Sequence, residues 1–243
     1  MVDKNLCVSD RYLNHRVVFI VPYFGKTPSY FSLWLQSAEK NPDFDFLIYS
    51  DLPLSIESRS NVKQVQMSFS QIKERIERIL KQKICLKTPY KLCDYKPSYG
   101  FLFEEYIQDY EYWGHCDCDL IFGNLNEILT PLLDKGYGKI FAAGHLTIYK
   151  NTFENNRLFM KPYKGKEIYK EAFTTDKIYV FDEDCIGDKN PEGKNIHAIF
   201  LSEKTRIYAK DLSMNASTTS GVFVNEYYDD KNRFFVKEQY RPK

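Results

Sequence analysis

The stretch Val17-Val-Phe-Ile-Val-Pro22 decides the fold. It is short, apolar and ended by a proline, which is typical of a strand buried in a parallel sheet. Pro28 then stands where a first helical position is expected, and apolar residues follow it at helical spacing: Phe31, Trp34, Leu35 and Ala38. Residues 44–49 are predicted to form a second strand. A strand, a helix and a strand in this order predict a right-handed, doubly wound α/β sheet.

The alternation of strands and helices continues along the chain. The further elements that we expect are a strand at 62–67, a helix capped by Ser70, a helix opening at Pro97, a strand from Tyr112, a helix capped by Asn124 and a strand at 139–143. Beyond residue 150 the pattern loosens, and short strands are expected at 178–181, 196–201, 206–209 and 222–224. The sequence therefore predicts a single domain over residues 1–243, with a mostly parallel sheet flanked by helices and an irregular C-terminal third.

Composition excludes several classes of protein. The 34 Lys and Arg residues and the 33 Asp and Glu residues leave a charge of +1, so nothing indicates a nucleic-acid partner. No apolar run approaches the roughly 20 residues of a membrane-spanning helix, and residues 1–16 carry charges where a signal peptide needs an apolar stretch. The six cysteines lack a C-x-x-C pair and zinc-finger spacing, which argues against a zinc site, and the charged N-terminal stretch without a signal peptide favours free thiols. We expect a globular cytoplasmic protein with at most peripheral contact with the inner face of the membrane.

The sharpest local feature is Asp117-Cys-Asp119, which follows a predicted strand. In an extended chain, residues i and i+2 point the same way, so two carboxylates at this spacing can hold one Mg²⁺ or Mn²⁺ ion beside a phosphate. The carboxyl end of a buried strand is also where open α/β sheets bind ligands. The alternative is a solvated turn. The chain has two other Asp-x-Asp pairs, at Asp43 and Asp182, whereas its 17 aspartates predict roughly one by chance.

Four segments together carry a resemblance to a known family. They are Lys91-Leu-Cys-Asp-Tyr-Lys-Pro-Ser-Tyr-Gly100, Trp113-Gly-His-Cys-Asp-Cys-Asp-Leu-Ile-Phe-Gly-Asn-Leu125, Gly144-His-Leu-Thr-Ile-Tyr-Lys-Asn151 and Phe181-Asp-Glu183. In this order they resemble a bacterial family of polysaccharide-building glycosyltransferases, which is similar to the GT-A nucleotide-sugar transferases with an Asp-x-Asp motif. The resemblance implies a GT-A-like, Rossmann-type fold with a nucleotide-binding part at about 16–125 and an acceptor-side part at about 138–243. It also implies a UDP-sugar donor, a divalent metal and a saccharide or lipid-linked acceptor.

The resemblance gives roles on the donor side to individual residues. Asp117 and Asp119 would hold Mn²⁺ or Mg²⁺ at the donor phosphates. The other donor contacts that we expect are Pro22, Tyr23 and Phe24 at the base, Asp51 at the base or ribose, Asp94 at a ribose hydroxyl and Lys96 near the phosphates. The competing interpretations are core packing for Tyr23 and Phe24 and an ordinary surface lysine for Lys96.

On the acceptor side, a carboxylate that removes the proton of the acceptor hydroxyl would assist transfer. Asp182 and Glu183 are the candidates for this base or for an acceptor contact, and Asp184 is less favoured. His145 would touch the donor sugar or the acceptor, or else serve the structure alone. A third metal ligand is open between His197, Asp211 and water, because related sequences continue to a later histidine. The alternatives are a non-catalytic nucleotide-sugar-binding relative and a metal-dependent phosphohydrolase; no P-loop motif is present.

Overall fold

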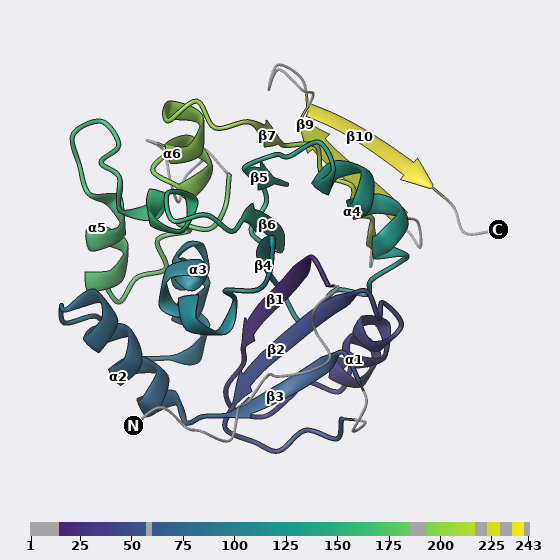
Figure 1. Ribbon diagram of the computed structural model, residues 1–243, viewed down its shortest axis with the longest axis horizontal. Helices are drawn as coiled ribbons and strands as arrows, with labels where there is room; N and C mark the ends of the chain where they lie inside the picture. The colour runs from purple at the N-terminus through teal and green to yellow at the C-terminus, as the bar shows by residue number, and fades with distance from the viewer. Residues whose placement is uncertain (1–14, 57–59, 185–192, 217–222, 229–234, 241–243) are drawn as a thin grey trace.

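The computed structural model of the chain describes residues 15–56, 60–184, 193–216, 223–228 and 235–240 (Figure 1). Its elements are β1 (Val17–Pro22), α1 (Phe31–Glu39), β2 (Phe44–Ser50), β3 (Val62–Gln66), α2 (Phe69–Leu80), η1 (Pro89–Ser98), α3 (Tyr99–Leu102), η2 (Glu104–Tyr106), β4 (Tyr112–Cys116), α4 (Leu125–Leu133), β5 (Lys139–Ile140), β6 (Leu146–Lys150), η3 (Asn155–Met160), α5 (Ile168–Thr174), α6 (Ile196–Ser202), β7 (Ile207–Tyr208), β8 (Asn215–Ala216), β9 (Phe223–Tyr228) and β10 (Phe235–Tyr240). The η elements are 3₁₀ helices.

Seven strands form one sheet in the order β3-β2-β1-β4-β6-β5-β7. Every neighbouring pair is parallel except the two that involve β6, which runs antiparallel to both β4 and β5. The chain first moves outward from β1 to β3 and then returns to place β4 on the other side of β1. The strand order therefore reverses between β1 and β4, which is the position where open α/β sheets bind ligands. The predicted α/β class, with a mostly parallel sheet flanked by helices, is confirmed.

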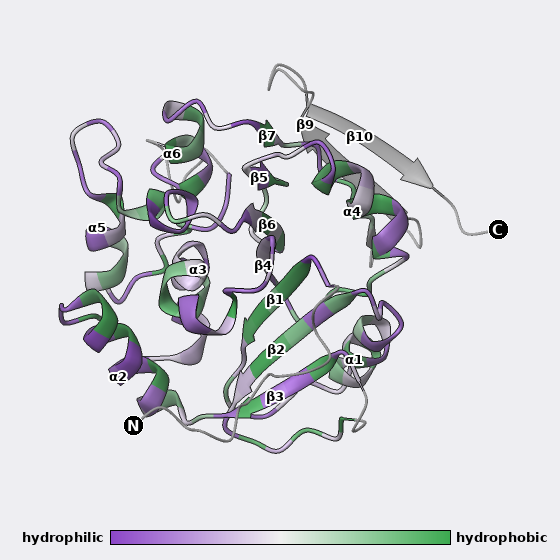
Figure 2. Cartoon of the chain, in the orientation of Figure 1, coloured by the Kyte–Doolittle hydropathy of each residue, from purple (hydrophilic) through white to green (hydrophobic). Residues whose placement is uncertain are grey.

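Alternate side chains of each strand enter two different cores. In β1, Val17, Phe19 and Val21 pack with the buried side chains of α1 and α4. Val18 and Ile20 point to the opposite face, which α2, α3, α5 and α6 cover (Figure 1). β1 and β2 are hydrophobic (green) along most of their length in Figure 2, which agrees with the burial of both their faces. This is the pattern expected of central strands in a doubly wound sheet.

Helix α2 begins earlier than its sequence suggests. Ser68, and not Ser70, is the N-cap residue: its hydroxyl accepts a hydrogen bond from the amide of Gln71, and the Gln71 side chain accepts one from the amide of Ser68. This reciprocal pair is a capping box, which satisfies two amides that the first helical turn leaves free. In the sequence, Gln71 three residues after Ser68 was the pattern that indicates this capping box. The predicted cap of α4, Asn124, is confirmed, because its side chain accepts from the amide of Glu127.

Other predicted elements differ from the structure. Pro97 does not open a helix; it lies inside η1, which begins at Pro89. Residues 196–201 form a helix instead of a strand, because the Asn195 side chain caps α6 by accepting from the amide of Ala198. Residues 178–181 form no strand, β5 and β7 each have two residues, and β6 was not predicted. Of the segment 222–224, residue 222 lies outside the described residues.

No helix in the described part of the chain has both the length and the apolar character needed to cross a membrane.

Candidate active site

A cavity of about 320 Å³ opens where the strand order reverses between β1 and β4. Three segments line it: the carboxyl end of β1 and the following turn (Ile20 to Phe24), η1 with the start of α3, and the carboxyl end of β4 (Cys116 to Cys118). The residues from β1 and its turn are apolar and aromatic, whereas η1 and the end of β4 contribute the charged side chains of Lys96 and Asp117. An apolar wall with a few converging polar groups is typical of a small-molecule site.

The turn after β1 is held by one of the predicted site residues. Asp51, just beyond β2, accepts a hydrogen bond of 2.8 Å from the amide of Gly25. Gly25 has a φ of +90°, a conformation that residues with a Cβ atom rarely adopt. The carboxylate of Asp51 therefore fixes the path of the chain that carries Tyr23 and Phe24. Its predicted contact with a base or ribose stays a prediction.

Four aromatic residues, Tyr23, Phe24, Tyr90 and Tyr99, line the cavity, and Tyr90 was not among the predicted site residues. Phe24 is buried against the ring of Phe69, and Tyr23 is half-buried beside Phe31. Tyr90, in the first turn of η1, also lines the cavity, but 75% of its surface is exposed. An exposed ring at the mouth of a cavity is a suitable stacking surface for a planar ligand. Pro89, which starts η1, was the only local signal for it.

Lys96 joins three segments that lie far apart in the sequence. Its ammonium donates to Asp117 Oδ1 at 2.6 Å, to Asp182 Oδ2 at 2.9 Å and to the carbonyl oxygen of Gly144 at 3.0 Å. Burial by itself lowers the pKa of Lys96, but the charges of Asp182 and Asp117 outweigh it and hold the pKa well above the usual range. Lys96 is therefore a buried cation and not an ordinary surface lysine.

The two carboxylates that receive this cation have altered acidity. Burial raises the pKa of Asp182 to about 6, although Lys96 opposes the rise and Glu183 adds to it. Burial also raises the pKa of Asp117, again against the effect of Lys96. Asp182 is only 2% exposed and does not line the cavity, whereas Asp117 does. Asp182 thus lies behind Lys96 as seen from the cavity.

Asp119 differs from its partner in the Asp-x-Asp pair. It is exposed and forms no hydrogen bond or ion pair with any described residue, and it does not line the cavity. Asp117 uses one carboxylate oxygen for Lys96, and no described group bonds to the other. The expected extended geometry is absent, because Cys118 and Asp119 form a turn after β4, but the charge of Asp119 still raises the pKa of Asp117, so the two carboxylates lie near each other. Free oxygens on two neighbouring carboxylates suit a hard cation such as Mg²⁺ or Mn²⁺. The residues present therefore fit a divalent metal, although one of them is already paired with an ammonium.

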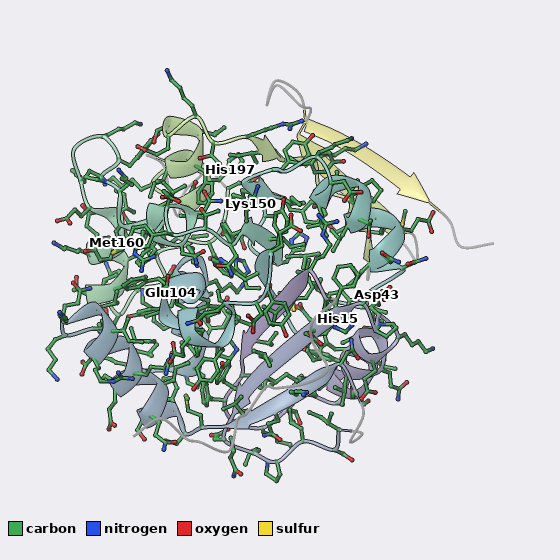
Figure 3. The ribbon with its side chains drawn as sticks, in the orientation of Figure 1. His15, Asp43, Glu104, Lys150, Met160 and His197 are labelled. Atoms are coloured by element: carbon green, nitrogen blue, oxygen red, sulfur yellow. The ribbon has the colours of Figure 1, made fainter. Side chains whose placement is uncertain are left out.

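His145 and Asp211 lie together at the same end of the sheet. The carbonyl oxygen of His145 accepts from the amide of Asp117 at 2.8 Å, and its Nε2 lies 3.6 Å from Asp211 Oδ1. Burial lowers the pKa of His145, but the hydrogen bond and charge of Asp211 outweigh it, so the pKa is raised. His197 is placed differently, on α6 (Figure 3), and no described hydrogen bond or ion pair joins it to Asp117 or Asp119. Of the two proposed third ligands, Asp211 is therefore the one near the Asp-x-Asp pair.

Gly144 brings Asp182 and Glu183 close to the backbone. Its amide donates to Glu183 Oε2 at 2.9 Å. A Cβ atom on Gly144 would lie 2.6 Å from Asp182 Oδ2 and 2.7 Å from Glu183 Oε1, both inside van der Waals contact. Only glycine lets the two carboxylates approach this far. Glu183 is half-buried and thus more open to a ligand than Asp182.

A second buried lysine, missed in the sequence, lies behind the acidic segment 182–184. Lys139 is fully buried at the start of β5 and donates to the carbonyl oxygen of Phe141 at 2.7 Å. Burial lowers its pKa to about 7, although the charges of Asp184 and Glu183 oppose the fall. Burial likewise raises the pKa of Asp184, against the effect of Lys139. A lysine inside an apolar strand was the signal that could have found it.

Asp94 is buried in a different arrangement. Its carboxylate accepts from Lys91 Nζ at 2.6 Å and from the amides of Tyr179 and Phe181 at 2.8 and 3.0 Å. Between those two amides, Val180 has a φ of +63°, which is rare for a β-branched residue. Asp94 thus fixes the segment that leads to the acidic residues 182–184. All its described bonds are internal, and its contact with a ribose stays a prediction.

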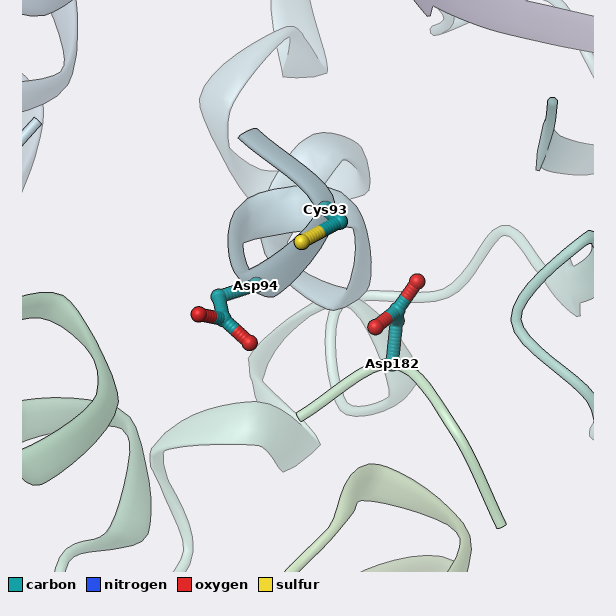
Figure 4. A group of neighbouring side chains, drawn as sticks. All are labelled: Cys93, Asp94 and Asp182. Atoms are coloured by element: carbon teal, nitrogen blue, oxygen red, sulfur yellow. The ribbon is translucent and has the colours of Figure 1, made fainter. Parts of the chain in front are cut away.

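Cys93, Asp94 and Asp182 lie close together, as Figure 4 shows, with ligand atoms within 4.8 Å of one another. They do not suit a metal ion. Burial raises the pKa of the Cys93 thiol to about 12, so the thiol stays protonated. Both oxygens of Asp94 accept hydrogen bonds, and Asp182 is paired with Lys96.

An α/β protein with a ligand-sized cavity at the reversal of its strand order is the class that this geometry defines. The sequence matches a family of unknown function (DUF6625) over residues 19–240, and the chain belongs to that family. No curated protein matches it. Among solved structures, the chain is similar to a "putative nucleotide-diphospho-sugar transferase" from Desulfovibrio desulfuricans, at 8% identity and a TM-score of 0.37, over 80% of this chain and 79% of that one.

Proposed function

We propose that the protein is a GT-A-like glycosyltransferase that moves a sugar from a UDP-sugar to a saccharide or lipid-linked acceptor in surface polysaccharide synthesis. The observation that carries the proposal is the cavity between β1 and β4, whose lining combines aromatic rings with the charged side chains of Lys96 and Asp117. A nucleoside diphosphate has matching parts, since it joins a flat base to two negative phosphates. The resemblance of the four sequence segments supports the same assignment.

On the donor side, the base rests among Tyr23, Phe24 and Tyr90, and the diphosphate lies toward Lys96. Its ammonium lies at the cavity wall, where it attracts the phosphates. Asp117 and Asp119 would hold Mn²⁺ or Mg²⁺, which when bound neutralises charge on the departing UDP. In this proposal residues of about 16–125 bind the nucleotide, and residues of about 138–243 bind the acceptor.

On the acceptor side, Asp182 and Glu183 are the candidate bases. A general base must reach the hydroxyl proton and have a pKa near the working pH. Asp182 has the raised pKa, about 6, but is almost fully buried. Glu183 is the more exposed and is oriented by the amide of Gly144, so it is the better placed for contact with an acceptor. Despite its burial, the hydrogen bond to Asp211 raises the pKa of His145, which would contact the donor sugar or the acceptor. We place this reaction in the cytoplasm, with at most peripheral association with the membrane.

The test is UDP release from a panel of UDP-sugars, with Mn²⁺ and saccharide acceptors. The native protein should release UDP in the presence of one donor, and Asp119→Asn should lower the rate by about 100-fold or more, a typical loss when a group that stabilises transition-state charge is removed. Asp43→Asn is the matched control. Asp43 is exposed before β2, belongs to another Asp-x-Asp pair and should leave the rate unchanged (Figure 3).

Other outcomes point to the alternatives. Equal rates for the native protein and Asp119→Asn would remove the metal role. Saturable UDP binding without turnover across the panel would identify a nucleotide-sugar-binding relative. Release of inorganic phosphate from simple phosphate esters would identify a phosphohydrolase.

A further inference from the structure

The ammonium of Lys96 lies where two acidic residues and a carbonyl oxygen converge. Asp117, Asp182 and Gly144 supply three oxygens within 3.0 Å of its nitrogen. Oxygen atoms of carboxylates and carbonyls are also what divalent cations prefer. In the described structure, a resident cation thus already neutralises one member of the Asp-x-Asp pair.

This arrangement opposes the binding of a metal ion by itself. A cation bound by the second oxygen of Asp117 would lie about 6 Å from the ammonium, because metal–oxygen bonds are about 2 Å long, the two oxygens of one carboxylate are about 2 Å apart, and Asp117 Oδ1 is 2.6 Å from Lys96 Nζ. Even with the dielectric constant of water, repulsion between a unit charge and a divalent ion at about 6 Å weakens binding roughly tenfold. The half-buried surroundings of Asp117 strengthen this repulsion.

A diphosphate in the cavity would reduce the repulsion between Lys96 and a metal ion bound at Asp117. Lys96 lines the cavity, so phosphate oxygens inside it can compensate the ammonium. Asp182, on the other side of Lys96, holds the ammonium whether or not Asp117 does. The side chain therefore has a partner in both situations.

From this geometry we propose that Lys96 couples the two ligands of the site: it suppresses divalent-cation binding at Asp117 and Asp119 until a nucleoside diphosphate occupies the cavity. The inference rests on the proposed function for the identity of the second ligand. By linkage, the nucleotide and the metal strengthen each other's binding by the same factor. Lys96 thereby weakens metal binding when the donor is absent.

The test measures Mn²⁺ binding by calorimetry and by the electron paramagnetic resonance signal of the free ion, without nucleotide. The native protein should bind Mn²⁺ weakly, and Lys96→Gln should bind it about tenfold more tightly or better, from the repulsion removed. Lys26→Gln is the control: Lys26 is exposed beside the β1 turn, and its loss changes the net charge equally. It should leave the Mn²⁺ affinity unchanged.

Removal of Lys96 leaves Asp182 buried without its cation, so a second variant guards against misfolding. Lys96→Gln with Asp182→Asn removes both charges and should show the same gain in Mn²⁺ affinity, whereas Asp182→Asn alone should not. Equal Mn²⁺ affinity in the native protein and in the folded double variant would overturn the proposal. With UDP present, native Mn²⁺ affinity should rise more than that of the Lys96 variants.

The two proposals fail in different ways. If no nucleoside diphosphate binds to any variant, the proposed function fails, while the comparison with Mn²⁺ alone still decides whether Lys96 opposes the metal. If UDP binds but the Lys96 variants gain no Mn²⁺ affinity, the coupling fails and the proposed function stands.

Discussion

Replacement of Asp182 by asparagine should stabilise the protein at neutral pH. The fold raises the pKa of this carboxyl from 3.8 to about 6, chiefly through burial, so folding favours its protonated form. At 1.36 kcal/mol per pH unit, this rise corresponds to about 3 kcal/mol. The stabilisation from the protonated Asp182 carboxyl is fully present below about pH 4 and is lost as the pH rises through 6. Asparagine is neutral throughout and can still accept a hydrogen bond from Lys96.

Urea unfolding of the native protein and Asp182→Asn at pH values from 4 to 8 measures the effect, with the fluorescence of Trp34 and Trp113 as the signal. The two proteins should have similar free energies of unfolding near pH 4, and the variant should be the more stable by about 2–3 kcal/mol at pH 8. Asp43→Asn, at an exposed position, should show a constant difference from the native protein.

The reasoning is refuted if Asp182→Asn is the less stable protein at pH 8, or if its difference from the native protein does not vary between pH 4 and 8. Either result would mean that Lys96 compensates the buried carboxylate fully. The predicted result would instead mean that the protein keeps an ionised group at a cost in stability, as is common where a residue serves function.

Three further substitutions test the geometry of the site. Gly144→Ala should displace the carboxylate of Glu183, destabilise the protein by about 1–3 kcal/mol and reduce UDP-sugar turnover more strongly; unchanged turnover would contradict the assignment. Tyr90→Ala should weaken UDP binding in calorimetry by about fivefold, the loss of about 1 kcal/mol of stacking, whereas Tyr90→Phe should bind normally; pyrophosphate affinity should be equal in all three. Gly100→Ala places a Cβ atom against the Trp113 ring and should destabilise the protein by a comparable 1–3 kcal/mol, seen as a lower urea midpoint, and a native midpoint would show that the ring moves.

Local patterns were sufficient for the elements from β1 to α2, apart from the cap of α2. The apolar run of β1, the helical spacing of α1 and the stripe of α2 each specify an element without help from the rest of the chain, and their order specifies a parallel sheet. Short apolar runs were ambiguous, because four to eight such residues suit a strand or a buried helix equally. The segment 196–201 belongs to this class, and the cap at Asn195 decides for a helix.

Tertiary contacts overrode the pattern before the acidic segment. Residues 178–181 are all β-branched or aromatic, as is typical of a strand, but Asp94 accepts hydrogen bonds from the amides of Tyr179 and Phe181, and Val180 between them has a positive φ. The carboxylate of Asp94, more than 80 residues earlier in the chain, thus supplies the hydrogen-bond acceptors that the carbonyl groups of a neighbouring strand would otherwise have supplied. No sequence pattern of 178–181 contains this information.

In the site too, some features follow from local sequence and others from contacts between distant segments. The sequence pointed to the ends of β1 and β4, and the structure opens a cavity between them. The sequence did not indicate that Lys96 would join Asp117 to Asp182, because Asp117 lies 21 positions and Asp182 lies 86 positions after Lys96. The metal, donor and acceptor roles of the predicted residues stay predictions.

A crystal structure with UDP and Mn²⁺ would test the central claim most directly. The account predicts the uracil ring between the β1 turn and Tyr90, the diphosphate beside Lys96, and Mn²⁺ on Asp117 and Asp119. Nucleotide bound elsewhere on the protein, with Lys96 still bridging Asp117 and Asp182 across an empty cavity, would contradict it.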